Sequence, residues 1–278
     1  MTEWRPLSQR HSGDAATNDG PFEGTPPHLK PSLLAWLSEA TYDDLSGTYQ
    51  VALMRALALL LRFDHFPHSA PAHRLQNAFI EAAAQSDDRL LDTVDGVLGQ
   101  GQRGDRKDLR AVLRLGGSIW TVAENGRSLE RVTDASSTAA TEAATTPQDE
   151  ASSELRTAWT HAYGRSPDAS DAWDHAIKAV EALLNPIVTP NNEKATLGSI
   201  ISAMRTKPSK WKHVLPADRE GGVETFINLL DLMWPNPDRH STGNTRPPTD
   251  AEARAVVQTA VLVVSWLRDG AIAKSEGA

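Results

Sequence analysis

The chain has 278 residues, of which 28 are Lys or Arg and 36 are Asp or Glu, so its formal net charge at pH 7 is −8. Because this charge provides no overall positive field, contact with a polyanion would require a local basic patch. The absence of cysteine excludes disulfide bonds, thiol catalysis and cysteine-ligated metal centres. A hydrophobic fraction of 40% is typical of a globular protein of one or two domains.

Neither a signal peptide nor a membrane span is expected. The N-terminal segment lacks the apolar run of a signal peptide. The longest apolar run, 256–267, is interrupted by polar residues and is shorter than the ~20 residues of a membrane span. We therefore expect a cytoplasmic protein that does not enter the membrane.

The N-terminal part is predicted to be helical. Residues 1–28 are polar and rich in Gly and Pro, which predicts disorder. Residues 29–133 form one expected unit that ends in a β-hairpin over 118–132, because Asn125-Gly126 suits a type I′ turn. Apolar periodicity predicts helices that begin near Pro31 and then cover 44–61, 74–84, 88–98 and 105–115.

A second helical unit is predicted after a change in composition. Residues 134–153 contain no Lys or Arg and no large apolar residue, which indicates a linker or a solvated, partly helical connector. The unit at 154–270 then has apolar residues at helical spacing, and 271–278 is a tail. Its helices are expected at 154–163, 169–184, 197–205, 223–234 and from Thr249, whose capping box uses Glu252, to Gly270. The fold class is therefore mainly α, with a small hairpin in the first unit and an antiparallel bundle in the second.

The second unit resembles a known family. The segments AWDHAIKAVEALL, PIVTPNNEKATLGSII, LLDLMW and DRHSTG, followed by a long last helix, are similar to the HEPN superfamily. More narrowly, they resemble the C-terminal domain of AbiJ-like abortive-infection proteins of actinobacterial type. The resemblance covers about 154–270 and implies an antiparallel HEPN-like bundle that dimerises. It also implies phage defence, with RNA as the partner and a phage or host protein as the trigger.

Many members of this family cut RNA without a metal, using an Arg and a His. Cleavage requires a base for the ribose 2′-OH, an acid for the leaving oxygen and a cation for the phosphorane charge. The resemblance implies that His240 is base and acid, that Arg239 binds phosphate, and that Asn236 and Asp238 support them. No cofactor is expected. The chain departs from the family motif, because the positions five and six residues before His240 hold Pro235 and Trp234 instead of Arg. The alternative for the DRH segment is an ordinary exposed turn.

Further candidates surround this turn. Glu181 is expected either to hold Arg239 or to form a flanking salt bridge on its helix. A basic segment containing a tryptophan is expected either to bind single-stranded RNA through phosphate contacts and stacking or to be a solvated loop with the indole in the core. This segment consists of Arg205, Lys207, Lys210, Trp211 and Lys212.

Two other clusters are interpreted as non-functional. The basic stretch from Arg103 to Arg114 is diluted by Asp105 and Asp108, which favours a solvated helix face. The histidines between Asp64 and His73 lie among prolines without rigid spacing, so no metal site is expected.

A rival function needs no catalysis. In it a degenerate HEPN-like bundle is a dimerisation or adaptor module, which pairs through the stripe around Trp173 or through the Val-rich last helix. The missing upstream Arg favours this alternative, whereas the basic segment favours action on RNA.

Overall fold

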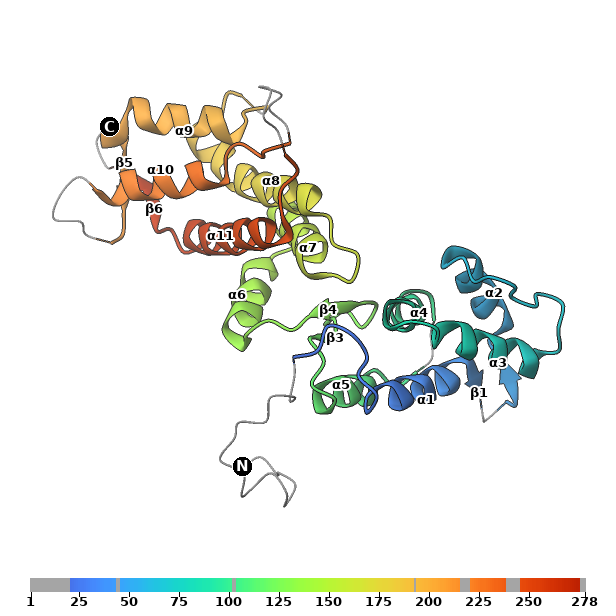
Figure 1. Ribbon diagram of the computed structural model, residues 1–278. Helices are drawn as coiled ribbons and strands as arrows, with labels where there is room; N and C mark the ends of the chain where they lie inside the picture. Colours follow the sequence, from blue (N-terminus) through green and yellow to red (C-terminus); the bar gives the residue numbers. More distant parts are fainter. Residues whose placement is uncertain are drawn as a thin grey trace, which may run out of the picture. The chain divides into compact units, whose positions relative to one another are not determined.

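The computed structural model describes residues 21–43, 46–101, 104–192, 194–215, 221–238 and 246–275. The protein is mainly α-helical, with small antiparallel strand pairs (Figure 1). Within these ranges, no helix combines the length and the apolar character that crossing a bilayer requires.

The chain folds as two compact units, 1–132 and 133–278. Each unit has its own hydrophobic core. The boundary falls at the start of the segment that was expected to be a linker, so residues 134–153 belong to the second unit.

The N-terminal unit buries one face of each of its helices. Helix α4 begins at the N-cap Ser86, whose side chain accepts a hydrogen bond from Arg89 N, and Asp105 caps α5 in the same way. Trp36, Leu37, Phe79 and Leu91 lie in the shared core. The helices are α1 (Lys30–Thr41), α2 (Val51–Leu60), α3 (Ala72–Ala83), α4 (Asp87–Gln100) and α5 (Arg106–Leu115).

A short hairpin stands where one continuous helix over 44–61 was expected. Strands β1 (Tyr42–Asp43) and β2 (Thr48–Tyr49) pair in antiparallel fashion, and α2 begins only afterwards. The rings of Tyr42 and Tyr49 face each other with centroids 4.6 Å apart. This aromatic cross-strand pair and Gly47, which has φ +63°, favour the hairpin over helix.

Part of the segment expected to be disordered is packed on the N-terminal unit. Phe22 N donates to Gly117 O and Phe22 O accepts from Ile119 N. Thr25 is buried and its hydroxyl donates to Asp87. The expectation of disorder is therefore wrong for 21–28, while residues 1–20 lie outside the described ranges.

The predicted β-hairpin is present, but its turn differs. Strands β3 (Trp120–Val122) and β4 (Leu129–Arg131) pair antiparallel. A type I′ turn requires positive φ at both central residues, whereas Gly126 has φ +69° and Asn125 is not among the positive-φ residues. Gly126 N instead donates to Ala123 O within a longer loop.

The C-terminal unit is a helical bundle built around an antiparallel helix pair. Helix α8 packs on α7, and α11 packs against both. The predicted capping box of α11 is confirmed: Thr249 and Glu252 each accept from the other's backbone N–H. The helices are α6 (Ala135–Thr145), α7 (Glu150–Tyr163), α8 (Ala169–Val188), α9 (Leu197–Thr206), α10 (Gly221–Met233) and α11 (Asp250–Arg268).

Helix α6 replaces most of the expected linker. Asp134 caps it by accepting from Ser136 N and Ser137 N, and alanine has the highest intrinsic helix propensity. Ala144 is buried, and α6 packs against α7 and α11. The segment thus takes the helical form that was left open as the alternative to a linker, and it packs on two neighbouring helices.

The segment expected to be a tail supplies a strand. Strand β6 (Ile272–Lys274) pairs antiparallel with β5 (Trp211–His213), which follows a 3-10 turn at Pro208–Lys210. Ile272 is buried in the core of the C-terminal unit. The chain thus returns to a position about sixty residues earlier in the sequence.

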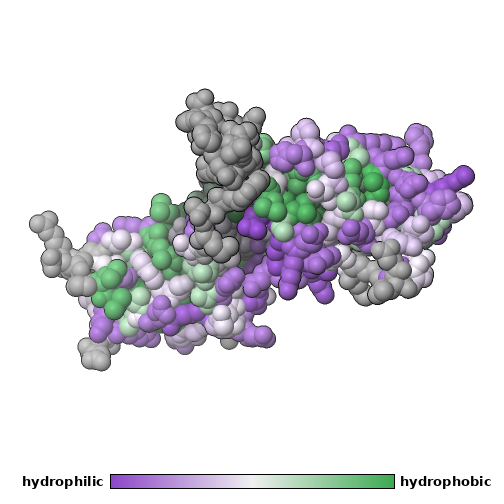
Figure 2. All heavy atoms as spheres, turned by 90° about the horizontal axis from the view of Figure 1, so that it is seen from below, coloured by the Kyte–Doolittle hydropathy of each residue, from purple (hydrophilic) through white to green (hydrophobic). Residues whose placement is uncertain are grey.

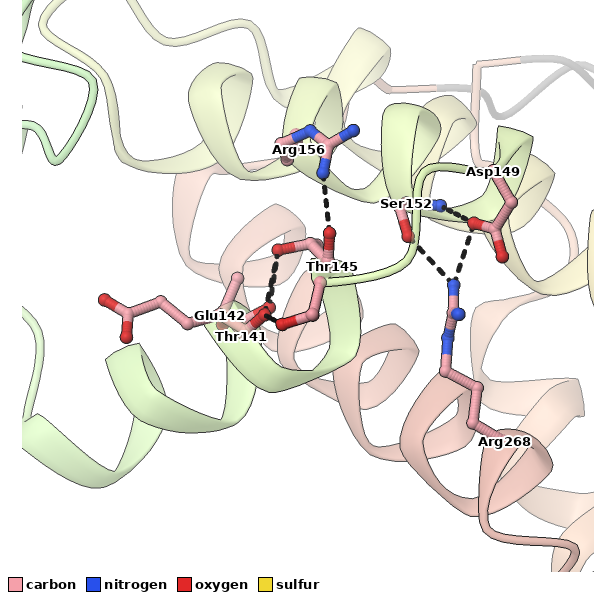
Figure 3. Close-up of polar contacts among 8 residues, drawn as sticks. Thr141, Glu142, Thr145, Asp149, Ser152, Arg156 and Arg268 are labelled. Carbon is pink, nitrogen blue, oxygen red and sulfur yellow. Dashed lines mark hydrogen bonds and ion pairs between the residues drawn. The ribbon is translucent and has the colours of Figure 1, made fainter.

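A polar clamp joins the last helix to the start of α7 (Figure 3). The Arg268 guanidinium donates to Asp149 at 2.9 Å and to the buried Ser152 hydroxyl at 2.9 Å. Arg156 donates to the carbonyl of Thr145 at 2.7 Å, which ties α7 to the end of α6. The hydrogen bonds from Arg268 and Ser152 lower the pKa of Asp149 from 3.8 to about 2.

This clamp predicts a pH-dependent contribution to stability. Because the folded-state pKa of Asp149 is depressed, its contribution is present above about pH 4 and is lost as the pH falls toward 2. Asp149 is 41% exposed, so solvent screening limits the effect of Asp149→Asn at pH 7 to about 1 kcal/mol of destabilisation. Urea unfolding at pH 7, 4 and 3 should show this difference shrinking at the acid end. The exposed neighbour Asp269→Asn is the control, and an equal loss there would contradict a specific clamp.

Candidate functional site

The turn that follows α10 is fixed to the beginning of α8. The indole N–H of Trp173 donates to Met233 O at 2.7 Å. Asn236 is 1% exposed, and its amide donates to Ser170 O at 3.2 Å and to Asp174 Oδ1 at 2.8 Å. Asn236 therefore holds the turn through buried hydrogen bonds and does not face solvent.

The rest of the predicted motif is described only in part. Asp238 N donates to Asn236 Oδ1 at 3.1 Å, and the Asp238 carboxylate accepts from the Ser170 hydroxyl. Arg239 and His240, the two residues predicted to be catalytic, lie outside the described residues. The structure describes the residues that precede them in the turn, Asn236 and Asp238.

Glu181 lies away from this turn. Its carboxylate accepts from Leu197 N at 2.6 Å, at the N-terminus of α9, where the Thr196 side chain accepts from Ser199 N. Ser170 and Glu181 are separated by eleven residues of α8, which corresponds to about 16 Å along the helix axis. Glu181 thus helps to cap a helix and is not grouped with Asn236 and Asp238.

A polar pocket of about 430 Å³ lies beside Glu181. Charged and amide side chains line it together with prolines and alanines. Its lining consists of Glu150, Lys178, Glu181, Ala182, Asn185, Pro186, Pro190 and Ala195. Its volume is within the range of small-ligand pockets.

Three of the predicted RNA-binding lysines do lie together. Lys207, Lys210 and Lys212 are exposed on the 3-10 turn and on β5. Strand pairing brings a fourth lysine next to this segment: Lys274 pairs with Trp211, so it lies on the opposite face of the two-stranded sheet from Lys212. None of the four side chains forms a hydrogen bond or ion pair with another described residue. We call these four residues the lysine ribbon. Sequence reasoning missed Lys274, because the pairing of β5 with β6 leaves no local signal.

The other two members of the predicted segment have structural partners. Trp211 is 7% exposed and packs in the core of the C-terminal unit, so its ring is not available for stacking on a base. The Arg205 guanidinium pairs with Asp231 and also donates to Asn228 at 3.3 Å. The lysine ribbon is therefore the part of this segment that remains available to a polyanion.

The basic stretch of the N-terminal unit holds the β3–β4 hairpin. Arg106 Nε donates to Gly126 O at 2.7 Å. Arg110 donates to Val122 O at 3.1 Å and to Ala123 O at 2.8 Å. These two cations satisfy backbone carbonyls of the hairpin, so at Arg106 and Arg110 the expected solvated helix face is instead a structural contact. In the described ranges, no group of three or more His, Asp or Glu side chains is arranged to hold a metal ion.

The two surfaces that the adaptor alternative would use are buried in the core of the C-terminal unit. Trp173 is 8% exposed, and Val257 and Val264 of α11 are fully buried. A dimer built on these residues would have to open the bundle.

Comparisons with known proteins leave the family unassigned. No family model, no curated protein and no solved structure matches the chain. Any function must therefore be argued from the residues described above and from the resemblance of the second unit.

The burial of Trp211 gives a prediction that separates core packing from base stacking. Its indole nitrogen is buried without a hydrogen-bond partner, so Trp211→Phe removes an unsatisfied donor and should cost no more than about 1.5 kcal/mol. Trp211→Ala leaves a cavity and should cost about 3 kcal/mol or more. Denaturant midpoints measure both. If Trp211→Phe lowered RNA affinity tenfold without a change in stability, a stacking role would be indicated after all.

The buried amide of Asn236 gives a second prediction. Asn236→Ala removes the donor to Ser170 O and Asp174 Oδ1 of α8, and it should destabilise the protein by about 1–3 kcal/mol. Asn191→Ala, at an exposed position, serves as the control and should stay within about 0.5 kcal/mol of the parent in urea unfolding. Equal stability of both variants would show that the turn is not anchored through this amide.

Proposed function

We propose that this chain is an abortive-infection protein whose HEPN-like C-terminal unit acts on RNA as a metal-independent endoribonuclease or as an RNA-binding protein. Phage defence rests on the resemblance of 154–270 alone. Action on RNA is supported by one observation of the described residues, the lysine ribbon. Four cations without carboxylate partners lie on or next to β5 and β6, in a chain whose total charge is −8.

The lysine ribbon suits a backbone ligand better than a specific base. Lys210 and Lys212 flank a buried tryptophan, and the antiparallel pairing places Lys274 on the adjacent strand. Ammonium groups contact phosphates as point charges and release counterions, which gives affinity without sequence preference. An RNA strand lying across the ribbon is the ligand that this charge pattern favours.

The alternative is a non-catalytic dimerisation or adaptor module. Such a module would need surfaces other than Trp173 and the α11 valines. Apolar residues form separate patches between hydrophilic ones on the face drawn in Figure 2. Leu232 on α10 is 72% exposed and Leu262 on α11 is 41% exposed, and these are the leucines that such a contact would use. Absence of RNA binding together with a concentration-dependent dimer in light scattering would favour this alternative.

Charge reversal tests the RNA proposal. The triple variant Lys207→Glu, Lys210→Glu, Lys212→Glu should weaken binding of a single-stranded RNA at least about tenfold near 100 mM salt. It should also reduce the slope of log affinity against log salt by about 2, since each lost phosphate contact contributes about 0.7. Fluorescence anisotropy with a labelled RNA measures both quantities.

The control changes the same amount of charge elsewhere. Arg55, Lys107 and Arg114 are exposed on α2 and α5, and replacing all three by Glu shifts the net charge equally. The proposal predicts that this variant keeps most of its affinity. Equal losses in the two variants would show that only the total charge matters, and unchanged binding in the first would refute the lysine ribbon as the RNA site.

A further inference from the structure

The polar pocket of the C-terminal unit is lined by two side chains of opposite charge that do not pair with each other. Glu150 lies at the start of α7 and Lys178 lies in α8, and both residues are exposed. Neither side chain forms a hydrogen bond or an ion pair with another described residue. A carboxylate and an ammonium group are therefore both available to a molecule that enters this pocket.

The register of the antiparallel helix pair places these two charges at the same level. His175 Nδ1 lies 2.5 Å from Glu154 Oε2, and the rings of His175 and His161 are parallel with centroids 5.8 Å apart. Since the two helices run in opposite directions, the position one turn before Glu154 lies beside the position one turn after His175. Those positions hold Glu150 and Lys178. The two charges thus line the pocket from different helices at one level of the pair.

A proline in α8 adds a backbone acceptor to the wall of the pocket. Pro186 lies inside α8 and has no N–H, so the carbonyl of Ala182, four residues earlier, lacks its α-helical donor. Ala182 and Pro186 both line the pocket. Glu181 lies on the same wall, where its carboxylate accepts from Leu197 N and adds a second negative charge. The wall formed by α8 therefore combines hydrogen-bond acceptors with one cation, Lys178.

This set of groups matches a ligand that carries both charges. Carboxylates and carbonyls accept hydrogen bonds from an ammonium group, and a lysine ammonium donates to a carboxylate. A ligand with only positive charge would be repelled by Lys178, and one with only negative charge would be repelled by Glu150 and Glu181. A zwitterion meets an opposite charge at each of its ends.

The volume of the pocket limits the size of this ligand. At about 30 Å³ for each water molecule, 430 Å³ corresponds to on the order of ten non-hydrogen atoms. An α-amino acid or a dipeptide has this size. The prolines and alanines of the lining, Pro186, Pro190, Ala182 and Ala195, supply apolar surface for the uncharged part of such a ligand.

We propose that the polar pocket binds a small zwitterion of the α-amino acid or dipeptide class, with its ammonium group on Glu150 and its carboxylate on Lys178. Glu181 and the carbonyl of Ala182 contribute acceptors to the same wall. This binding function goes beyond the action on RNA and does not depend on it, because no residue of the pocket belongs to the lysine ribbon.

The first test uses the parent protein and needs no substitution. Isothermal titration calorimetry of the full-length chain is carried out with each of the common L-amino acids and with alanyl-alanine. The proposal predicts saturable binding of at least one probe at one site per chain. The N-acetyl derivative of that probe lacks the ammonium group and its amide lacks the carboxylate, so each derivative should bind at least about tenfold more weakly. Comparison of alanine with alanyl-alanine distinguishes the amino acid from the dipeptide as the preferred ligand.

The second test assigns each charged end to its residue. Lys178→Gln and Glu150→Gln should each weaken binding of the probe at least about tenfold. In Lys178→Gln the amide derivative should bind as well as the probe itself, and in Glu150→Gln the N-acetyl derivative should do so. Both substitutions remove exposed groups without partners, so the midpoint of urea unfolding should stay at the parent value.

The controls make the same changes of charge outside the pocket. Lys107→Gln on α5 and Glu224→Gln on α10 are at exposed positions and should keep the affinity of the parent for the probe. Equal losses in the controls would show that only the net charge matters. Absence of binding by every probe at millimolar concentration, or equal affinity of the parent for the probe and its two derivatives, would overturn the proposal. RNA binding is measured separately by anisotropy, so neither result bears on the lysine ribbon.

Discussion

The packing of α8 against α7 is the constraint on which the rest of the C-terminal unit depends. Trp173, Val180 and Leu184 bury one side of α8, so the 3.6-residue period fixes where every other side chain of that helix points. Ser170, Asp174 and Glu181 fall on one flank, where they receive the turn after α10 and the start of α9. His175 falls on another, where it pairs with Glu154 of α7. A single buried stripe thus sets the positions of the anchored turn, the pocket and the histidine pair.

Local signals predicted most helices, and non-local contacts account for the differences. The capping box at Thr249 and the apolar stripe of α8 each depend on residues a few positions apart in the sequence, and both are present. The pairing of β5 with β6 joins positions about sixty residues apart and has no local signature. Composition left 134–153 open between a linker and a partly helical connector, and the packing of Ala144 and Thr141, the buried residues of α6, decides for the helix. The proximity of His161 to His175 became visible only once the register of α7 on α8 was known.

The candidate RNA surface shows how little the net charge of −8 constrains a local site. The sequence pointed to the lysines at 207, 210 and 212 through the concentration of basic residues around a tryptophan. It grouped them with Trp211, which is buried in the core, and with Arg205, which pairs with Asp231. Burial divides that segment into anchoring and exposed side chains, and no periodicity rule distinguishes them in such a short strand. The same reasoning applies to Asn236, a polar residue of a turn that carries buried hydrogen bonds. Residue type indicated where polar chemistry is concentrated, whereas burial decided which groups are free for it.

The strand pair β5–β6 also has a consequence for synthesis of the chain. Strand β5 emerges from the ribosome about sixty residues before its partner, and during that interval its edge and the indole of Trp211 lack their final cover. A nascent chain paused in α11 would therefore present an unpaired strand edge, which is a template for contact with other chains. Pairing of β5 with β6, which brings Lys274 next to the segment that carries the other three lysines, occurs only after translation has passed residue 274. The strand pair is thereby completed after the helices that support it.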